Sequence, residues 1–285
     1  MLPTAPCQVR PMTTQHHNQY ADLFTLCRGD QRYGGERVFD EPVVVSVLAG
    51  ELRVVQAART QHCGVGDMVL LPRHQPATLL KYPKDGQAYQ ALLLKLPAGL
   101  VQAYYAQHPS ALARRAPEGP RYYPAHPLGQ SLFASLLPYL ALEQPLPGPL
   151  LTTKVTEAIE VLRSLDPLTD GLLADFSEPG KLNLVDFMTA HYLVNLPLAQ
   201  FSYLTGRSLT TFKRDFKKAF QLSPQRWLTR QRLAQAHYQL TEKGRRPVEL
   251  YQEVGFENLA HFSFAFKKQF GYPPTALSSP PGADR

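Results

Sequence analysis

One sequence pattern occurs twice in the last third of this chain, and it constrains the fold more than any other feature. Residues 212–224 read FKRDFKKAFQLSP, and residues 262–274 read FSFAFKKQFGYPP. Both fit F-x-x-x-F-K-K-x-F-x-x-x-P. Phenylalanines four residues apart fall on one face of an α-helix, and the paired lysines fall beside them. The repeat predicts two similar amphipathic helices, each with an aromatic face and a basic edge.

A glycine turn stands upstream of each copy: LTGRS at 204–208 and VGFEN at 254–258. A hydrophobic helix, a glycine turn and a basic helix form a helix-turn-helix, a motif that places its second helix in the major groove of DNA. Two such motifs in tandem indicate a double-stranded DNA partner.

The distribution of charge supports this interpretation. Residues 1–180 contain 15 Lys and Arg against 16 Asp and Glu, whereas residues 181–285 contain 15 against 7. The net charge of +7 therefore arises in the part that carries the repeat. A basic domain joined to a nearly neutral one indicates a polyanion partner for the first and a different task for the second.

Length and composition set further limits. A chain of 285 residues with 44% hydrophobic residues has room for two cored domains. We expect no membrane span and no export signal, because the apolar runs are strand-sized and the N-terminus lacks an apolar core. The cysteines, Cys7, Cys27 and Cys63, are odd in number and scattered. This usage favours a reducing cytoplasm over a disulfide framework.

The N-terminal half changes its hydrophobic period near residue 97. Before it, VVVSVLAGELRVVQAA at 43–58, with Gly50 at a hairpin turn, a second strand pair around Pro72–Pro76, and a strand at 88–96 predict a small barrel or sandwich. After it, apolar residues recur at helical spacing. The helices between about 128 and 165 are the expected site of homodimer contact.

Residues 176–181, FSEPGK, contain Pro179 and Gly180 and are the predicted linker. The predicted domains are therefore an N-terminal domain at 1–175, a DNA-binding domain at 182–277 and a disordered tail at 278–285. We expect helices at about 184–193, 198–204, 208–220, 224–240, 248–254 and 258–270. The second helix of each motif, at 208–220 and at 258–270, is called its reading helix, because this helix is expected to enter the major groove. Ser208 is the predicted N-cap of the first reading helix.

Residues 182–277 resemble the DNA-binding domain of the AraC/XylS transcription regulators, on the segments FKK…F…SP and GFEN…HFSFAFKKQFGYPP. The N-terminal strands resemble the cupin barrel of many AraC-type sensors. The resemblance implies an α+β protein with a cupin-like β-barrel and trailing helices, followed by an all-α domain of two helix-turn-helix lobes joined by a long helix. The segments FSEPGK, YLTGRS and FKRDFKKAF also resemble a branch of this family that includes type III secretion activators.

By this resemblance, Thr210, Lys213 and Arg214 occupy the base-contacting positions of the first reading helix. A solvated basic face that touches only phosphates is the alternative for the two charged residues. The predicted DNA-binding residues are Ser208, Thr210, Lys213, Arg214 and Lys217 in the first motif, and Asn258, Leu259, Ser263, Phe264, Lys267 and Lys268 in the second.

The second reading helix departs from the family pattern. Leu259, Ala260, Ser263 and Phe264 stand at the corresponding positions, and none is charged. Phe264 points away from the predicted aromatic face, towards thymine methyls or towards another helix or partner. We therefore expect this lobe to add affinity more than specificity.

The central helix carries Arg226, Arg230 and Arg232, for which phosphate contact and a solvated helix face are equally good interpretations. Trp227, the only tryptophan, is predicted to be a core residue.

The N-terminal domain offers few candidates for chemistry. The strands contain Gly66 to Pro72 in the cupin spacing but lack the HxH pair, and Ala77 stands where a further histidine ligand is needed. His16, His17 and His62 do not complete a metal set. We expect no metal and no cofactor. Arg73 and His74, near the barrel mouth, are the candidates for effector binding, with a solvated turn as their alternative.

The sequence thus predicts a cytoplasmic, non-enzymatic, sequence-specific transcription regulator. Its N-terminal domain senses an effector and dimerises. Control by a protein partner instead of a small molecule is one alternative, and a cupin enzyme tethered to DNA is another. An apolar interior with space for a ligand favours a small-molecule sensor, whereas a filled interior favours protein control.

Overall fold

The computed structural model describes residues 23–57, 60–109, 119–141 and 146–277. The predictions for Cys7, His16, His17 and the 278–285 tail lie outside these residues. Within them, none of the helices combines the length and the apolar character needed to cross a membrane.

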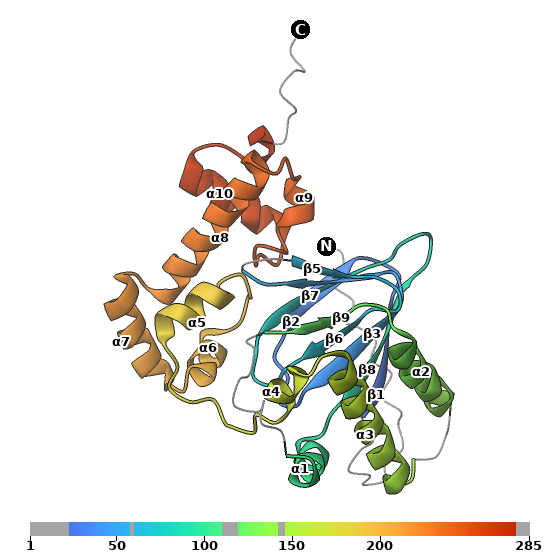
Figure 1. Ribbon diagram of the computed structural model, residues 1–285. Helices are drawn as coiled ribbons and strands as arrows, with labels where there is room; N and C mark the ends of the chain where they lie inside the picture. The colour runs from blue at the N-terminus through green and yellow to red at the C-terminus, as the bar shows by residue number, and fades with distance from the viewer. Residues whose placement is uncertain (1–22, 58–59, 110–118, 142–145, 278–285) are drawn as a thin grey trace.

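The N-terminal domain contains two antiparallel sheets that face each other (Figure 1). The first has the order β1-β8-β3-β6-β9 and the second the order β2-β7-β4-β5. The strands of the first sheet are β1 (Phe24–Gly29), β8 (Tyr89–Lys95), β3 (Val43–Ala49), β6 (Met68–Leu71) and β9 (Arg121–Tyr123). Those of the second are β2 (Tyr33–Arg37), β7 (Ala77–Tyr82), β4 (Glu51–Val55) and β5 (Thr60–Cys63).

Strand alternation divides the core of this domain into two layers. In β3, Val43, Val45 and Val47 point between the sheets, while Val44 points to the opposite face and packs with the helices. All four are at most 2% exposed. Successive side chains of a strand point to opposite faces, so a strand buried on both faces needs a continuous apolar run. The sequence VVVSVLA meets that need.

The predicted hairpins are wrong in their pairing, although their turns are correctly placed. β3 and β4 flank Gly50 but belong to different sheets, as do β6 and β7 on either side of Pro72–Pro76. Gly50 has φ +79°, and a Cβ there would stand 2.4 Å from the carbonyl oxygen of Tyr82. Each turn is therefore a corner at which the chain passes from one sheet to the other. The short strand β9 was missed because RYY carries too little periodic signal.

Four helices cover the outer face of the first sheet (Figure 1). They are α1 (Ala98–Gln107), α2 (Pro127–Leu136), α3 (Gly148–Leu165) and α4 (Thr169–Leu173). A 3-10 segment, Leu137–Ala141, follows α2. It contains Pro138, which has no N–H to donate and so ends the α-helix.

The apolar stripe on the helices between about 128 and 165, which predicted a dimer contact, packs in the core of the N-terminal domain. Leu132, Leu136, Val155, Ile159 and Leu162 are at most 1% exposed and belong to one core cluster with the first sheet. On the same segment, Leu128 and Leu137 remain 46% and 42% exposed. The stripe itself therefore cannot meet a second chain.

The C-terminal domain is helical and has two lobes. The first contains α5 (Leu184–His191), α6 (Leu198–Leu204) and α7 (Leu209–Phe220). The long helix α8 (Pro224–Thr241) leads to the second lobe, with α9 (Pro247–Leu250), α10 (Leu259–Phe270) and a 3-10 turn at Pro274–Leu277. The fold class is confirmed. Helix α9 is shorter than the predicted 248–254, because the chain turns tightly towards Gly255, which has φ +82°.

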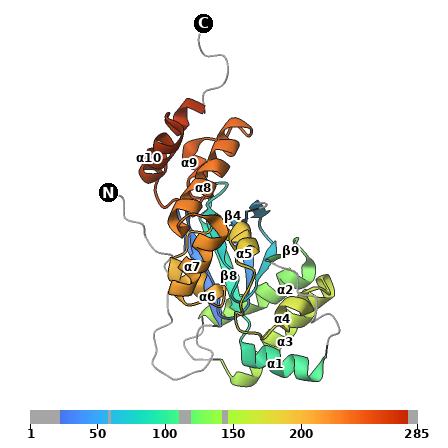
Figure 2. The ribbon, with the colours of Figure 1, turned by 90° about the vertical axis from the view of Figure 1, so that its left-hand side faces the viewer.

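The second lobe packs on the outer face of the second sheet. Val55, Leu80 and Tyr82 of that sheet share a core cluster with Leu250 and Val254. Figure 2, turned by 90° from Figure 1, shows the helical domain running along one side of the sheets. Residues 175–183, which include the predicted linker, lie in no helix or strand.

The buried stripe gives a matched pair of substitutions on α2. We expect Leu132→Ala to lower the free energy of unfolding by about 2–5 kcal/mol, because it empties a fully buried site. Leu128→Ala, on the same helix but 46% exposed, is expected to change it by less than about 1 kcal/mol. Urea denaturation followed by circular dichroism measures both; equal effects would contradict this packing.

Candidate nucleic-acid interface

The first reading helix, α7, is held by its aromatic face. Phe212 and Phe216 are fully buried, and the Phe216 ring lies 4.4 Å from that of Phe220 and 5.6 Å from that of Trp227. Trp227 is 8% exposed, so its predicted core role is confirmed. The Ser208 Oγ accepts a hydrogen bond from the Thr211 N–H at 3.3 Å, as expected of the predicted N-cap.

The second reading helix, α10, repeats this construction. Phe262 and Phe266 are fully buried, and the Phe266 ring lies 4.6 Å from that of Phe270. The Asn258 Oδ1 accepts a hydrogen bond from the His261 N–H at 2.7 Å. Both reading helices end in a left-handed residue, Gln221 in the first lobe and Gly271 in the second. Equivalent positions in the two helices can therefore be compared directly.

The outward face of α7 is polar and basic. Thr210, Lys213, Arg214 and Lys217 are all exposed. The side chain of Arg214 is 76% exposed, and its guanidinium lies 3.4 Å from Asp215. Asp215 also accepts from Arg207 at 3.3 Å. Desolvation would raise the pKa of Asp215, but the hydrogen bonds from these two arginines outweigh it and lower the pKa. Asp215 therefore stays charged beside Arg207 and Arg214.

The outward face of α10 has a different chemistry. Phe264 is 70% exposed, beside exposed Ala260, Lys267 and Lys268. Leu259 and Ser263 are half-buried. The structure thus gathers the predicted residues on one helix in each lobe, and it leaves both outward faces open to solvent.

A buried arginine in α8 contacts both lobes. The Arg232 guanidinium donates to the backbone oxygens of Tyr192, Val194 and Gly255 at 2.8, 2.9 and 3.0 Å, and to the Asn195 Oδ1 at 2.9 Å. Arg232 is 8% exposed, and burial lowers its pKa to about 10, which leaves it charged at neutral pH. Tyr192, Val194 and Asn195 belong to the connection between α5 and α6, whereas Gly255 belongs to the second lobe.

Phosphate contact and a solvated helix face are therefore both wrong interpretations for Arg232, whereas Arg226 and Arg230 are exposed. The sequence did contain a signal for this difference. Arg232 follows Leu228 by four residues and precedes Ala236 by four, so it lies on the buried face of α8.

The candidate effector residues lie against the linker. Arg73 donates to Glu178 at 2.8 Å and contacts the His74 Nε2 at 2.7 Å. His74 has φ +56°, and its ring lies 6.0 Å from that of Tyr203 in α6. Burial, and then the charge of Arg73, lower the pKa of His74. The structure thus engages these residues with the linker and the first lobe.

The space between the two sheets is occupied by side chains. Val45, Leu52, Val54 and Leu71 are at most 2% exposed there, with Cys63 and Tyr89 among them. Burial raises the pKa of the Cys63 thiol to about 12. His62 instead points outward and lies 3.0 Å from Glu51. Within the described ranges, no three His, Cys, Asp or Glu residues are grouped as metal ligands.

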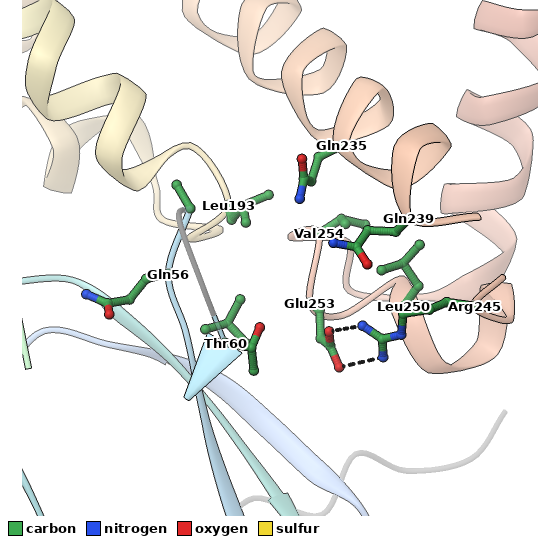
Figure 3. A pocket seen from close by; sticks show the side chains of 11 residues that line it. Gln56, Thr60, Leu193, Gln235, Gln239, Arg245, Leu250, Glu253 and Val254 are labelled. Carbon is green, nitrogen blue, oxygen red and sulfur yellow. Dashed lines mark hydrogen bonds and ion pairs between the residues drawn. The ribbon is translucent and has the colours of Figure 1, made fainter. Parts of the chain in front are cut away.

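A polar junction joins the domains beside their apolar contact. Glu253 of the second lobe is 5% exposed and lies 3.5 Å from Arg53 of β4 and 3.0 Å from the Arg245 Nη2. Arg32 donates to the backbone oxygens of Val248 and Glu249. A cavity of about 220 Å³ opens here, between Gln56 and Thr60 on one side and Gln235 and Gln239 of α8 on the other (Figure 3).

Comparisons with known proteins agree with this architecture. Residues 203–279 match the family model described as a helix-turn-helix domain. The HTH-type transcriptional regulator ExsA of Pseudomonas aeruginosa is 28% identical over 84% of this chain and 86% of its own length. The thermoregulatory protein LcrF of Yersinia pestis is 32% identical over 32% of this chain and 34% of its own.

These matches support the resemblance of residues 182–277 to the DNA-binding domain of the AraC/XylS transcription regulators. Among solved structures, an apo variant of ToxT from Vibrio cholerae matches 90% of this chain and 97% of its own, with 10% identity and a TM-score of 0.44. The helix-turn-helix match and the similarity to ExsA over most of both chains identify the protein as a DNA-binding transcription regulator, and its helical domain has two helix-turn-helix lobes.

The Arg232 contacts generate a prediction with a control on the same helix. We expect Arg232→Met to lower the free energy of unfolding of the helical domain by about 3 kcal/mol or more, since it leaves several buried acceptors unsatisfied. The exposed Arg230→Met is expected to change it by about 0.5 kcal/mol or less. Guanidinium denaturation measures both, and a change below 1 kcal/mol for Arg232→Met would show that its contacts do not join the lobes.

Proposed function

We propose that this protein is a sequence-specific transcription activator that reads DNA with α7 and uses α10 as a second contact. The observation that carries the proposal is the outward face of α7, where exposed Thr210, Lys213 and Arg214 stand on a helix fixed by buried phenylalanines. Arginine can donate two hydrogen bonds to guanine, and lysine can reach the same edge. The names of the Yersinia relatives, which include a virulence regulon transcriptional activator, support activation.

The lysines of α10 have a different role in this proposal. Lys267 and Lys268 lie in the last turn and are exposed. They form a basic edge at the end of the helix and fit phosphate contact, which sets affinity and not sequence preference. Ser208 and Asn258 cap one N–H group of each helix N-terminus, and the remaining N–H groups of those first turns can attract phosphate as well.

Two substitutions separate base reading from phosphate binding. Arg214→Ala is expected to weaken binding to cognate DNA by about 1–3 kcal/mol and to relax preference at one base pair. Lys268→Ala is expected to weaken cognate and random DNA alike and to reduce the salt slope of binding by about one. Fluorescence anisotropy at several salt concentrations measures both effects. Equal losses on cognate and random DNA for Arg214→Ala would remove it from base reading.

We further propose that the signal reaches the N-terminal domain through its surface, as a protein partner. The supporting observation is the packed interior between the sheets, where apolar side chains form one buried cluster. The effector role of Arg73 and His74 is replaced in this proposal by a structural one, fastening the linker through Glu178. On this proposal the protein is cytoplasmic and non-enzymatic, which its relatedness to transcription regulators supports. Homodimer formation remains part of the proposal, and sedimentation equilibrium of the full chain tests it.

Protein control can be distinguished from small-molecule control by fractionation. We expect the dissociation constant for selected DNA to stay unchanged when the dialysed protein receives the low-molecular-mass filtrate of a cell extract. The retained protein fraction is expected to change it, and protease treatment of that fraction to abolish the change. A shift caused by the filtrate would instead show a small-molecule effector.

A further inference from the structure

Phe264 occupies the position in the second lobe that Arg214 occupies in the first. Each lies two residues after the first buried phenylalanine of its reading helix, Phe212 or Phe262. The Arg214 side chain is 76% exposed, and Phe264 is 70% exposed. Since the two helices have their caps and their buried phenylalanines at equivalent positions, both side chains project from the same place on their lobes.

The fold of the second lobe does not use the Phe264 ring. Phe262, Phe266 and Phe270 of α10 make ring contacts with one another, whereas Phe264 is absent from the aromatic contacts of the described residues. Phe264 is also the most exposed large hydrophobic residue in that part of the chain. Burying a large, exposed apolar ring against a partner removes it from water, and this transfer favours binding.

The neighbours of Phe264 select the kind of surface that buries it. Ala260, four residues earlier, is exposed and small, so a binding partner can approach the helix closely there. Lys267 and Lys268 follow within the next turn and are exposed. A protein surface that buries the Phe264 ring would also have to accommodate the charges of these two lysines. In the major groove of DNA, the bordering phosphates neutralise both charges.

We propose that Phe264 is a specificity-determining residue that packs on the C5-methyl group of a thymine in the major groove. Thymine alone among the four bases presents a methyl group there, and phenylalanine and alanine are side chains that contact it. The inference rests on the proposed function and refines it: the second lobe reads sequence by apolar contact instead of by hydrogen bonds. If the lobes enter successive major grooves, the thymine lies about 10 base pairs from the base that Arg214 reads.

The test removes only the methyl group. Sites are first selected from random duplex DNA with the full chain. Each thymine of the selected site is then replaced singly by deoxyuridine, and the dissociation constant is measured. We expect one deoxyuridine position in the second half of the site to weaken binding about fourfold, which corresponds to about 0.8 kcal/mol for one methyl-sized group.

Variants assign this effect to the side chain. Phe264→Ala is expected to bind the thymine and deoxyuridine sites with equal affinity, whereas Phe264→Leu retains part of the difference. Tyr238→Ala, which removes an aromatic ring 47% exposed on α8, is the matched control and leaves the fourfold difference unchanged. Because Phe264 and Tyr238 are both exposed, thermal unfolding of the variants should match that of the unaltered protein.

The outcomes separate this inference from the function on which it rests. If Arg214→Ala alters cognate binding but no deoxyuridine position matters, thymine reading is overturned and the proposed function stands. A deoxyuridine effect that persists in Phe264→Ala also overturns the assignment. If selection enriches no sequence at all, sequence-specific reading fails, and the inference fails with it.

Discussion

The buried guanidinium of Arg232 is the constraint on which the arrangement of the two reading helices depends. An arginine removed from water needs its donors satisfied, and here all the partners are neutral oxygens, contributed by both lobes. The same constraint explains Gly255. A Cβ at that position would stand 2.5 Å from the carbonyl oxygen of Leu193 and 2.8 Å from the Arg232 Nε. Glycine is required there because the backbone must approach the guanidinium closely.

The second sheet of the N-terminal domain serves two neighbours at once. Its inner face completes the core between the sheets, and its outer face meets the second lobe through Val55 and Leu80. The ion pairs of Glu253 with Arg53 and Arg245 lie at the edge of that contact. Events at the N-terminal surface therefore have a short route to the DNA-binding domain, which runs through packed side chains and charge pairs and not through the linker alone.

Sequence reasoning succeeded where local pattern determines structure. The phenylalanine spacing placed α7 and α10, and Ser208 was correctly chosen as an N-cap. It failed where a feature is decided by distant partners. Gly50 correctly marked a turn, but only the pairing of β3 with β6 and β8 shows that the chain changes sheets there. Likewise, no local signal placed Arg73 and His74 beside Glu178, which is more than 100 residues away. Arg232 lies between these two cases. Its place on the buried face of α8 could be predicted from the sequence, but its hydrogen-bond partners could not.

The contacts of Arg232 with both lobes also limit which promoters this protein can bind. Both reading helices contact α8, and both lobes hydrogen-bond to its Arg232, so the distance between their DNA contacts is a property of the protein. An extra base pair between the two contacted sequences rotates one by about 35° relative to the other around the duplex axis. Such a promoter can be occupied only if the DNA untwists or bends, at an energetic cost that depends on the flexibility of the intervening steps. Spacer length and spacer composition thus become determinants of promoter strength, although neither contacts a side chain.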